Sequence, residues 1–319
     1  MLDWRLDGGR GAGDGYNYPM RSLTKDERRT EQRLPGSKNL DRMSTAEIVR
    51  LMNREDRKVA EVVGRELPAI ARAVDAIVAA IRAGGRLFYV GAGSSGRMAV
   101  LDAAECPPTF GISPKTMRAF IAGGRRAVTG AVEGAEDSVA NGERDLRRVK
   151  LTKKDVVVGI AASGTTPYVL GAMSYARRRG VMTVAVTSNR RMAVTRLAKI
   201  AIATEVGPEV LTGSTRLKAG TSQKMVLNML STAVMVRLGH VYENLMIDAV
   251  LTNEKLHERA VRILTEASGK SVSAAERALR AAGHNMRVGL VMLKLAVDAR
   301  EARKRLTAAR GDLRRALEE

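Results

Sequence analysis

Residues 155–167 read DVVVGIAASGTTP, and this stretch decides the fold. It opens with a continuous apolar run, which is typical of a parallel strand buried on both faces. A turn of Ser, Gly and Thr then leads to Pro167, which suits the first position of a helix because its missing N–H is not needed there. The stretch therefore predicts a buried strand, a tight turn and a helix in direct succession.

Residues 86–97, RLFYVGAGSSGR, repeat the same order of strand, Gly/Ser turn and helix. The remaining strands are expected at 118–121, 182–187 and 200–204, and the helices between strands at 96–104, 136–148 and 167–179. Strands that alternate with helices of about a dozen residues form right-handed βαβ units. The expected fold class is therefore α/β with a central parallel sheet.

Helical periodicity flanks the expected sheet on both sides. The periodicity of residues 44–82 predicts one or two long helices. Ser44 and Glu47 have the spacing of a capping box at the start of the segment, and Pro68 is expected to begin a second helix or to kink the first. A long apolar helix is expected at 216–239, another helix at 252–267, and three or four short amphipathic helices at 271–319.

This pattern divides the chain into three parts. Residues 1–21, rich in Gly and Asp and without periodicity, are expected to be a disordered leader, with Met20 as an alternative initiator. Residues 22–268 are expected to form the α/β domain with its N-terminal helices. Residues 269–319 are expected to form a small all-α bundle beyond the turn at Ser268 and Gly269.

Composition narrows the class of protein. No run of 18 apolar residues is present in the sequence, so no helix is expected to span a membrane. The first 20 residues lack the apolar region of a secretory signal. The single cysteine, Cys106, excludes an intramolecular disulfide and favours a reducing compartment.

Charge is the unusual quantity. The 54 Lys and Arg exceed the 34 Asp and Glu, for a net charge of +20, which raises the question of a polyanionic partner such as nucleic acid. The surplus is diffuse, without a long block of like charges, and aromatic residues at 3% are too few for a base-stacking surface. Nucleic-acid binding is therefore disfavoured.

Both Gly/Ser/Thr turns have the composition of a phosphate site. Each combines backbone N–H groups at the positive end of a helix dipole with small hydroxyl side chains. The hydroxyls are those of Ser94 and Ser95 in the first turn and of Ser163 and Thr166 in the second. Ordinary helix caps are the alternative interpretation, because Ser and Thr are also good N-cap residues.

The first turn also matches a dinucleotide fingerprint in form, as Gly91-x-Gly93-x-x-Gly96. Such a site needs an acidic residue about 20 residues later, at the end of the next strand. The corresponding stretch, 107–111, reads PPTFG and contains no acidic residue. A monoester phosphate is therefore favoured over a dinucleotide.

Residues 207–224, GPEVLTGSTRLKAGTSQK, closely resemble the signature shared by the glucokinase-regulatory-protein family and the bacterial N-acetylmuramic acid 6-phosphate etherases. Further segments are similar to the etherases in particular: 101–111, 121–124, 131–137, 244–248 and 252–255. The resemblance implies a sugar-isomerase (SIS) domain, a three-layer sandwich around a central parallel sheet. It also implies a small C-terminal bundle that resembles a ubiquitin-associated domain.

For activity, the resemblance implies a cytoplasmic homodimer that needs no metal or organic cofactor. These etherases cleave the D-lactyl ether of N-acetylmuramate 6-phosphate, giving N-acetylglucosamine 6-phosphate and D-lactate, during recycling of cell-wall muropeptides. Two alternatives share the domain: a sugar-phosphate isomerase and a non-catalytic sugar-phosphate sensor. Sensors of the glucokinase-regulator kind carry two SIS domains, whereas 319 residues have room for one.

The implied chemistry is a β-elimination. Once the sugar ring is open, a base can remove the acidic C2 proton, and an acid helps the lactate to leave from C3. By motif, the resemblance places the two catalytic glutamates at Glu105, as the acid at the lactate oxygen, and at Glu136, as the base at C2. Glu133 competes with Glu136 for the second role, and Ser214 is a further candidate for binding the sugar.

The expected position of Glu105 suits an acid. Pro107 is expected to stop the helix that leaves the first turn, so that Glu105 closes the helix where the dipole disfavours a charged carboxylate. Two places depart from the etherase pattern. Thr165 stands where these enzymes commonly carry Arg, and Ser188-Asn189-Arg190 replaces a common Cys-Asn-Pro.

Four further residues have open roles. Lys218 and Arg216 could meet the phosphate or the lactyl carboxylate, or could serve the structure or a dimer. His257 could assist ring opening or lie on a helix surface. Cys106 is expected to be a buried small hydrophobe, because no His neighbours it in a nucleophile motif.

Overall fold

The computed structural model describes residues 28–318, so the expected leader and Met20 lie outside the described residues. Five parallel strands form one sheet in the order β2-β1-β3-β4-β5. The strands are β1 (Leu87–Gly91), β2 (Met117–Ile121), β3 (Val156–Ile160), β4 (Met182–Thr187) and β5 (Ile200–Ala203). Each lies within a residue or two of its predicted position, and β3 is buried along its whole length, as its apolar run predicts.

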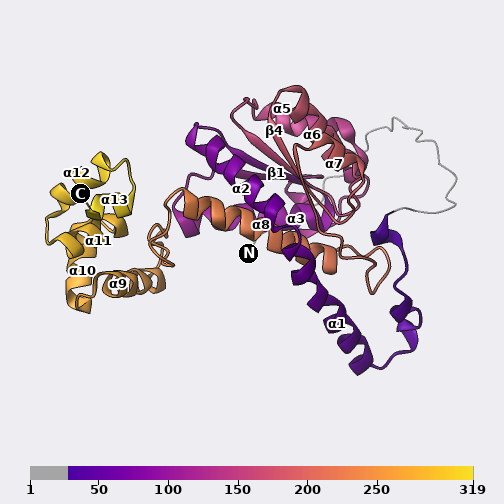
Figure 1. The fold of residues 1–319 in the computed structure, drawn as a ribbon, viewed down its shortest axis with the longest axis horizontal. Helices are drawn as coiled ribbons and strands as arrows, with labels where there is room; N and C mark the ends of the chain where they lie inside the picture. The colour runs from indigo at the N-terminus through magenta and orange to yellow at the C-terminus, as the bar shows by residue number, and fades with distance from the viewer. Residues whose placement is uncertain (1–27, 319) are drawn as a thin grey trace, which may run out of the picture.

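Helices cover both faces of the sheet, which confirms the three-layer α/β sandwich (Figure 1). One face packs against α2 (Leu67–Arg82), α3 (Gly93–Phe110) and α8 (Lys218–Arg237). The other packs against α5 (Val139–Arg148), α6 (Pro167–Arg178) and α7 (Ala193–Leu197). The alternation of strand side chains divides the core, since Leu87 and Tyr89 of β1 point to the first face and Phe88 and Val90 to the second.

The N-terminal helices begin where their sequence signals predict. Ser44 and Glu47 form the expected capping box ahead of α1 (Thr45–Gly64), with the Ser44 N–H donating to the Glu47 carboxylate at 2.8 Å. Pro68 lies in the first turn of α2, where its missing N–H is harmless, so the segment is two helices. Figure 1 shows α1 extending away from the sheet at the end of the molecule opposite the C-terminal helices.

Five helices make up the C-terminal part: α9 (Glu254–Ser268), α10 (Val272–Ala281), α11 (Met286–Leu295), α12 (Ala299–Ala308) and α13 (Leu313–Glu318). The four that follow Gly269 match the predicted short helices. However, Ala260 and Leu264 of α9 are fully buried in the same core as these four. The turn at Ser268 and Gly269 therefore does not separate the two cores, and we propose that the C-terminal bundle begins ahead of α9.

The end of α3 departs from the prediction. The helix does not stop at Pro107 but continues through Pro108 to Phe110, which is buried in the core. Gly111, in the left-handed conformation, ends it and donates its N–H to the Pro107 carbonyl. Burial of Phe110 and this cap offset the hydrogen bonds that the two prolines cannot make. Glu105 therefore lies inside the helix, and the dipole argument for its protonation does not apply.

Candidate active site

The two Gly/Ser/Thr turns lie side by side at the carboxyl edge of the sheet. Gly91, which ends β1, pairs in register with Ile160, which ends β3, so the turns start about 5 Å apart. From there α3 passes to one face of the sheet and α6 to the other. Such a point, where neighbouring connections diverge, is where open α/β sheets bind ligands.

The first turn is too tight for a side chain at Gly91 or at Gly96. A Cβ on Gly91 would lie 2.7 Å from the Gly96 nitrogen, and one on Gly96 would lie 2.5 Å from the Ile121 side chain. The N-cap of α3 is Ala92, which has no polar side chain to satisfy the first amides of the helix. These amides, together with the half-buried Ser94 hydroxyl, are available to an anion.

The second turn orients its hydroxyls for donation. The backbone N–H and the hydroxyl of Thr165 both donate to Ser163 Oγ, at 3.2 and 3.1 Å. With its oxygen used as an acceptor, Ser163 keeps its own O–H for a ligand. Thr166 occupies the N-cap of α6, yet its side chain makes no cap hydrogen bond. Thr165, the first departure from the etherase pattern, therefore has a defined structural task.

A cavity of about 250 Å³ opens beside the first turn. Ser94 lines it from α3, and the loop after β2 contributes both Glu133 and Glu136. Glu136 lies on a short 3₁₀ turn, η4 (Ala135–Asp137), and is exposed. The structure thus brings Ser94, a predicted phosphate ligand, together with Glu133 and Glu136, the two candidates for the base.

Arg97 holds the glutamate loop against α3, a role that the sequence did not indicate. Its Nε donates to the carbonyls of Ala127 and Val128, both at 3.1 Å, and its NH2 group donates to the Gly130 carbonyl at 2.8 Å. These carbonyls belong to α4 (Arg126–Thr129) and the residue that follows it. The only sequence signal for this role is the position of Arg97 directly after the glycine turn.

Glu105 lies elsewhere on α3 and does not line the cavity. It is 11 residues beyond Ser94, which corresponds to about 16 Å along the helix axis. Eleven residues make about three turns, so both side chains point from the same face of α3. Leu101 lies between them on this face, with 52% of its surface exposed. Within one chain, Glu105 therefore lies outside the cavity that Glu136 lines.

Ser214 and Lys218 are also outside the cavity. Ser214 lies in the loop between β5 and α8 and is not among the residues that line the cavity. Lys218 is 2% exposed and forms an ion pair with Glu55 of α1 at 2.8 Å. The backbone N–H of Lys218 donates to the buried Glu209 carboxylate. The structure therefore assigns Lys218 to the packing of α1 on α8, while Arg216 remains exposed.

The other candidates do not take part in the cavity. Burial raises the pKa of the Cys106 thiol to about 12, so the thiol stays protonated and is a poor nucleophile. Its Sγ donates to the Asp102 carbonyl within α3, as expected of a structural residue. His257 packs edge-on against His284 in the C-terminal bundle, with ring centroids 5.4 Å apart.

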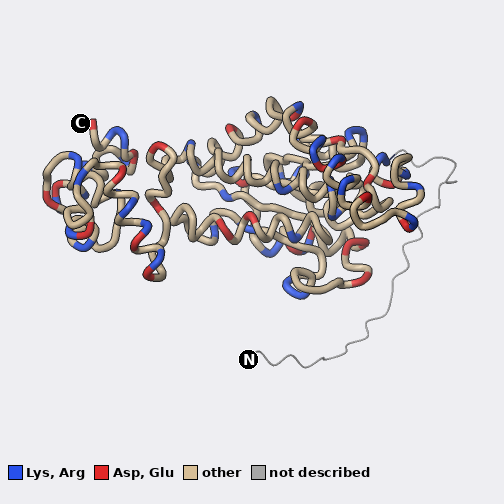
Figure 2. The backbone as a smooth tube through the Cα atoms, turned by 90° about the horizontal axis from the view of Figure 1, so that it is seen from below, with Lys and Arg blue, Asp and Glu red and all other residues tan. Residues whose placement is uncertain are grey.

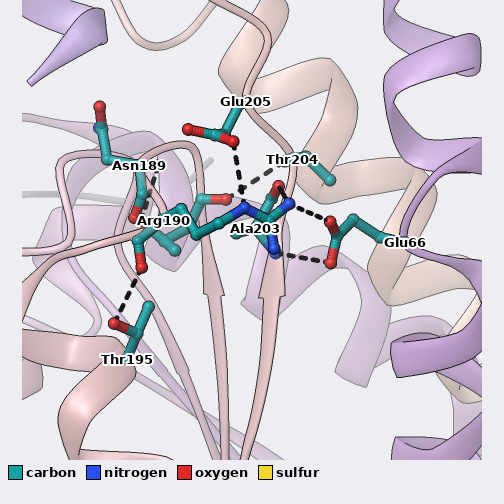
Figure 3. A network of polar contacts seen from close by, with 8 residues as sticks. Glu66, Asn189, Arg190, Thr195, Ala203, Thr204 and Glu205 are labelled. Carbon is teal, nitrogen blue, oxygen red and sulfur yellow. Dashed lines mark hydrogen bonds and ion pairs between the residues drawn. The ribbon is translucent and has the colours of Figure 1, made fainter.

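Asn189 and Arg190, from the second departure, join distant segments at the carboxyl edge (Figure 3). The Asn189 amide donates to the Ala162 carbonyl of the second turn at 2.9 Å and accepts from the Arg29 N–H at 2.8 Å. Arg190 forms ion pairs with Glu66, ahead of α2, at 2.6 Å and with Glu205 at 3.1 Å. The second turn is thus tied to the N-terminal segment and to α2.

Substitution of Arg190 by Ala is expected to lower the free energy of unfolding by about 1–3 kcal/mol. The Glu66 carboxylate, 7% exposed, would lose its only cationic partner among the described residues. Chemical denaturation of the purified chain measures this loss. Arg191→Ala is the matched control, because Arg191 is an exposed neighbour without an ion pair in the described range. Equal losses in both variants would contradict a stabilising role for this network.

Comparison with known proteins gives consistent matches. Residues 69–177 match the glucokinase regulatory protein N-terminal SIS domain, and residues 137–233 match the SIS domain. The N-acetylmuramic acid 6-phosphate etherase of Serratia proteamaculans is 54% identical over 288 residues, covering 90% of this chain and 97% of its own. The N-acetylmuramic acid 6-phosphate etherase of Geobacillus thermodenitrificans is 52% identical over 289 residues, covering 91% and 98%.

Among solved structures, a phosphoheptose isomerase from Francisella tularensis matches 61% of this chain and 100% of its own. Its sequence identity is 18% and its TM-score is 0.48.

Proposed function

The chain belongs to the N-acetylmuramic acid 6-phosphate etherase family, and from this membership we propose how its cavity and turns carry out the reaction. The enzyme is a carbon–oxygen lyase that splits the D-lactyl ether of N-acetylmuramate 6-phosphate, giving N-acetylglucosamine 6-phosphate and D-lactate. The observation that carries this conclusion is the identity of 54% across 90% of the chain.

We propose that the 6-phosphate binds between the two turns. Ser94 and Ser95 would donate from the first turn, and Ser163 and Thr166 from the second, together with the first amides of α3 and α6. Two helix N-termini that meet at one point of the sheet support this assignment, because their dipoles both favour an anion. Ser214, in the loop between β5 and α8, remains a candidate for contacting the sugar.

Glu136 is proposed to be the base at C2 of the ring-opened sugar. It removes the C2 proton, the electrons form a C2–C3 double bond, and the C3–O bond breaks. The lactate oxygen leaves with a proton from an acid, after which water adds its oxygen to C3 and a proton returns to C2. The shared cavity of Ser94 and Glu136 supports this role, because it places a carboxylate beside the phosphate site. Arg97 is a positioning residue that fixes the loop.

The acid, Glu105, is proposed to act in the cavity of a second copy, so that the enzyme is a homodimer. If α3 packs against α3 of a partner in antiparallel fashion, a twofold axis near Leu101 brings each Glu105 toward the Ser94 end of the other helix. The spacing of these residues on one exposed face of α3 supports this arrangement. Each site would then hold one glutamate from each chain.

The apolar surface beside this face of α3 supports the dimer. Asp102 of α3 accepts hydrogen bonds from Asn228 and Ser231, which ties α3 to α8. A groove of about 640 Å³ runs along the outward side of α8, and another of about 530 Å³ lies between α2 and α8. Apolar side chains line these grooves: Leu67, Ile70, Val74, Met225, Met229, Ala233 and Val236. An exposed apolar area of this kind is typical of a protein interface.

We further propose that the enzyme acts in the cytoplasm, where recycled muropeptides supply its substrate. The buried, unpaired Cys106 thiol is compatible with a reducing compartment. Within residues 28–318, no helix has the length and apolar character needed to cross a membrane.

Incubation with N-acetylmuramate 6-phosphate in heavy-oxygen water tests the proposed reaction. Elimination followed by water addition is expected to place one heavy oxygen at C3 of the N-acetylglucosamine 6-phosphate, and none in the lactate, as mass spectrometry of both products would show. Label in the lactate would instead indicate cleavage at the lactyl carbon. A sugar-phosphate isomerase would release no lactate at all.

A further inference from the structure

The proposed function leaves the large positive charge unexplained, because hydroxyls and backbone amides dominate the phosphate subsite. A second cavity, of about 610 Å³, lies where the bundle meets the ends of α2 and α8. Five arginines line it: Arg82, Arg237, Arg310, Arg314 and Arg315. Only two acidic residues line it, Glu243 and Asp312, so its lining carries a net charge of 5 − 2 = +3. We call it the junction cavity.

Four of these arginines have no carboxylate partner among the residues that the structure describes. Arg82 donates to the Arg237 carbonyl at the end of α8, at 2.8 Å, and Arg314 stacks on the Tyr242 ring at 5.3 Å. Among residues 28–318, neither these two nor Arg237 and Arg310 form an ion pair. Asp312 lies directly ahead of α13, and its carboxylate accepts the backbone N–H of Arg315 in the first turn of that helix.

Some arginines of the bundle outside the junction cavity do form ion pairs. Arg287 forms an ion pair with Asp248, and Arg305 with Glu301. Figure 2 shows basic and acidic residues interspersed along most of the chain. The guanidinium groups of Arg82, Arg237, Arg310 and Arg314, which form no ion pair within residues 28–318, lie around one cavity. Like charges repel one another, and an anion between them would relieve that repulsion.

We propose that the junction cavity binds a diphosphate group. An arginine guanidinium can donate two parallel hydrogen bonds to the oxygens of one phosphate group. The arginines of the junction cavity extend both from the ends of α2 and α8 and from the bundle. The volume is within the range of small-ligand sites. Val236, Leu238 and Val241 also line the cavity, so the diphosphate could be free or attached to a nucleoside. In either case the bound anion would link Arg237 of α8 to Arg310 and Arg314 of the bundle.

Calorimetric titration of the full chain with inorganic pyrophosphate, at physiological salt, tests this proposal. Wild type is expected to bind with saturation, and the double variant Arg310→Gln/Arg314→Gln is expected to bind at least tenfold more weakly. The matched control is Arg277→Gln/Arg300→Gln, which removes the same charge from exposed arginines of the bundle outside the cavity. The control is expected to stay within twofold of wild type.

Three outcomes would overturn the proposal: no saturable binding by wild type, equal weakening in both double variants, or an unchanged affinity in the first. Titration with a nucleoside diphosphate distinguishes the two sources, because tighter binding than pyrophosphate would identify the nucleotide. Tighter, Arg310-dependent binding of a DNA duplex would instead assign the cavity to nucleic acid. Lactate release without pyrophosphate is expected to be the same in all variants, so this proposal and the etherase function can fail separately.

Discussion

Substitution of Glu136 by Gln is expected to lower the turnover of N-acetylmuramate 6-phosphate by about 10²–10⁴-fold. The amide has nearly the same shape as the carboxylate but cannot accept the C2 proton, so binding should persist while proton transfer fails. Lactate release under substrate saturation measures the loss. A second measurement isolates the step: exchange of the C2 proton with heavy water should disappear in the variant.

Glu133→Gln is the matched control, because Glu133 lines the same cavity from the same loop. Its turnover is expected to stay within about tenfold of wild type. If Glu133→Gln loses C2 exchange while Glu136→Gln retains it, the two assignments must be reversed. Glu105→Gln should differ from both, since loss of the acid leaves proton removal at C2 possible and blocks the departure of lactate.

A mixture of the inactive variants Glu105→Gln and Glu136→Gln is expected to regain about a quarter of wild-type activity when the subunits exchange at random. Half of the dimers would then contain one chain of each kind. In such a dimer, one site combines the intact Glu136 of one chain with the intact Glu105 of the other, and the second site has neither. Unfolding and refolding the variants together, or co-expressing them with different tags, supplies the mixed dimer.

The control for this experiment is the pair of variants mixed without subunit exchange, which should remain inactive. Activity that fails to return in a purified mixed dimer would show that both glutamates act within one chain. Leu101→Asp provides an independent check, since a buried charge at the proposed twofold axis should yield monomers with little activity. An unchanged dimer in sedimentation analysis would place the interface elsewhere.

Local signals account for most of the fold. The apolar run of β3, the Ser44–Glu47 capping box and the position of Pro68 each act within a few residues, so the sequence suffices to predict them. The end of α3 was mispredicted because burial of Phe110 and the Gly111 cap, rather than proline alone, determine where the helix ends. Amphipathic periodicity does not say which core a helix joins, so the proposed start of the bundle ahead of α9 rests on the shared burial of Ala260 and Leu264.

The site was predicted in its parts but not in its arrangement. Ser94 and Glu136 were each predicted from their own motifs, and the structure places both on one cavity at the carboxyl edge of the sheet. The ion pair of Lys218 with Glu55 joins residues 163 positions apart, and the contacts of Arg97 span about 30 positions. Such long-range pairings have no periodic signature. The exposure of Glu105 likewise depended on the packing of α3 against α8.

The hydrogen bonds inside the second turn also determine which ionic form of the substrate is accepted. Because Thr165 donates two hydrogen bonds to Ser163 Oγ, that hydroxyl can donate a hydrogen bond to the ligand but cannot accept one from a P–OH group. The helix amides around it are donors as well. A phosphate monoester loses its second proton at a pKa of about 6. The turn therefore favours the dianion, and substrate binding is expected to weaken as the pH falls below this range.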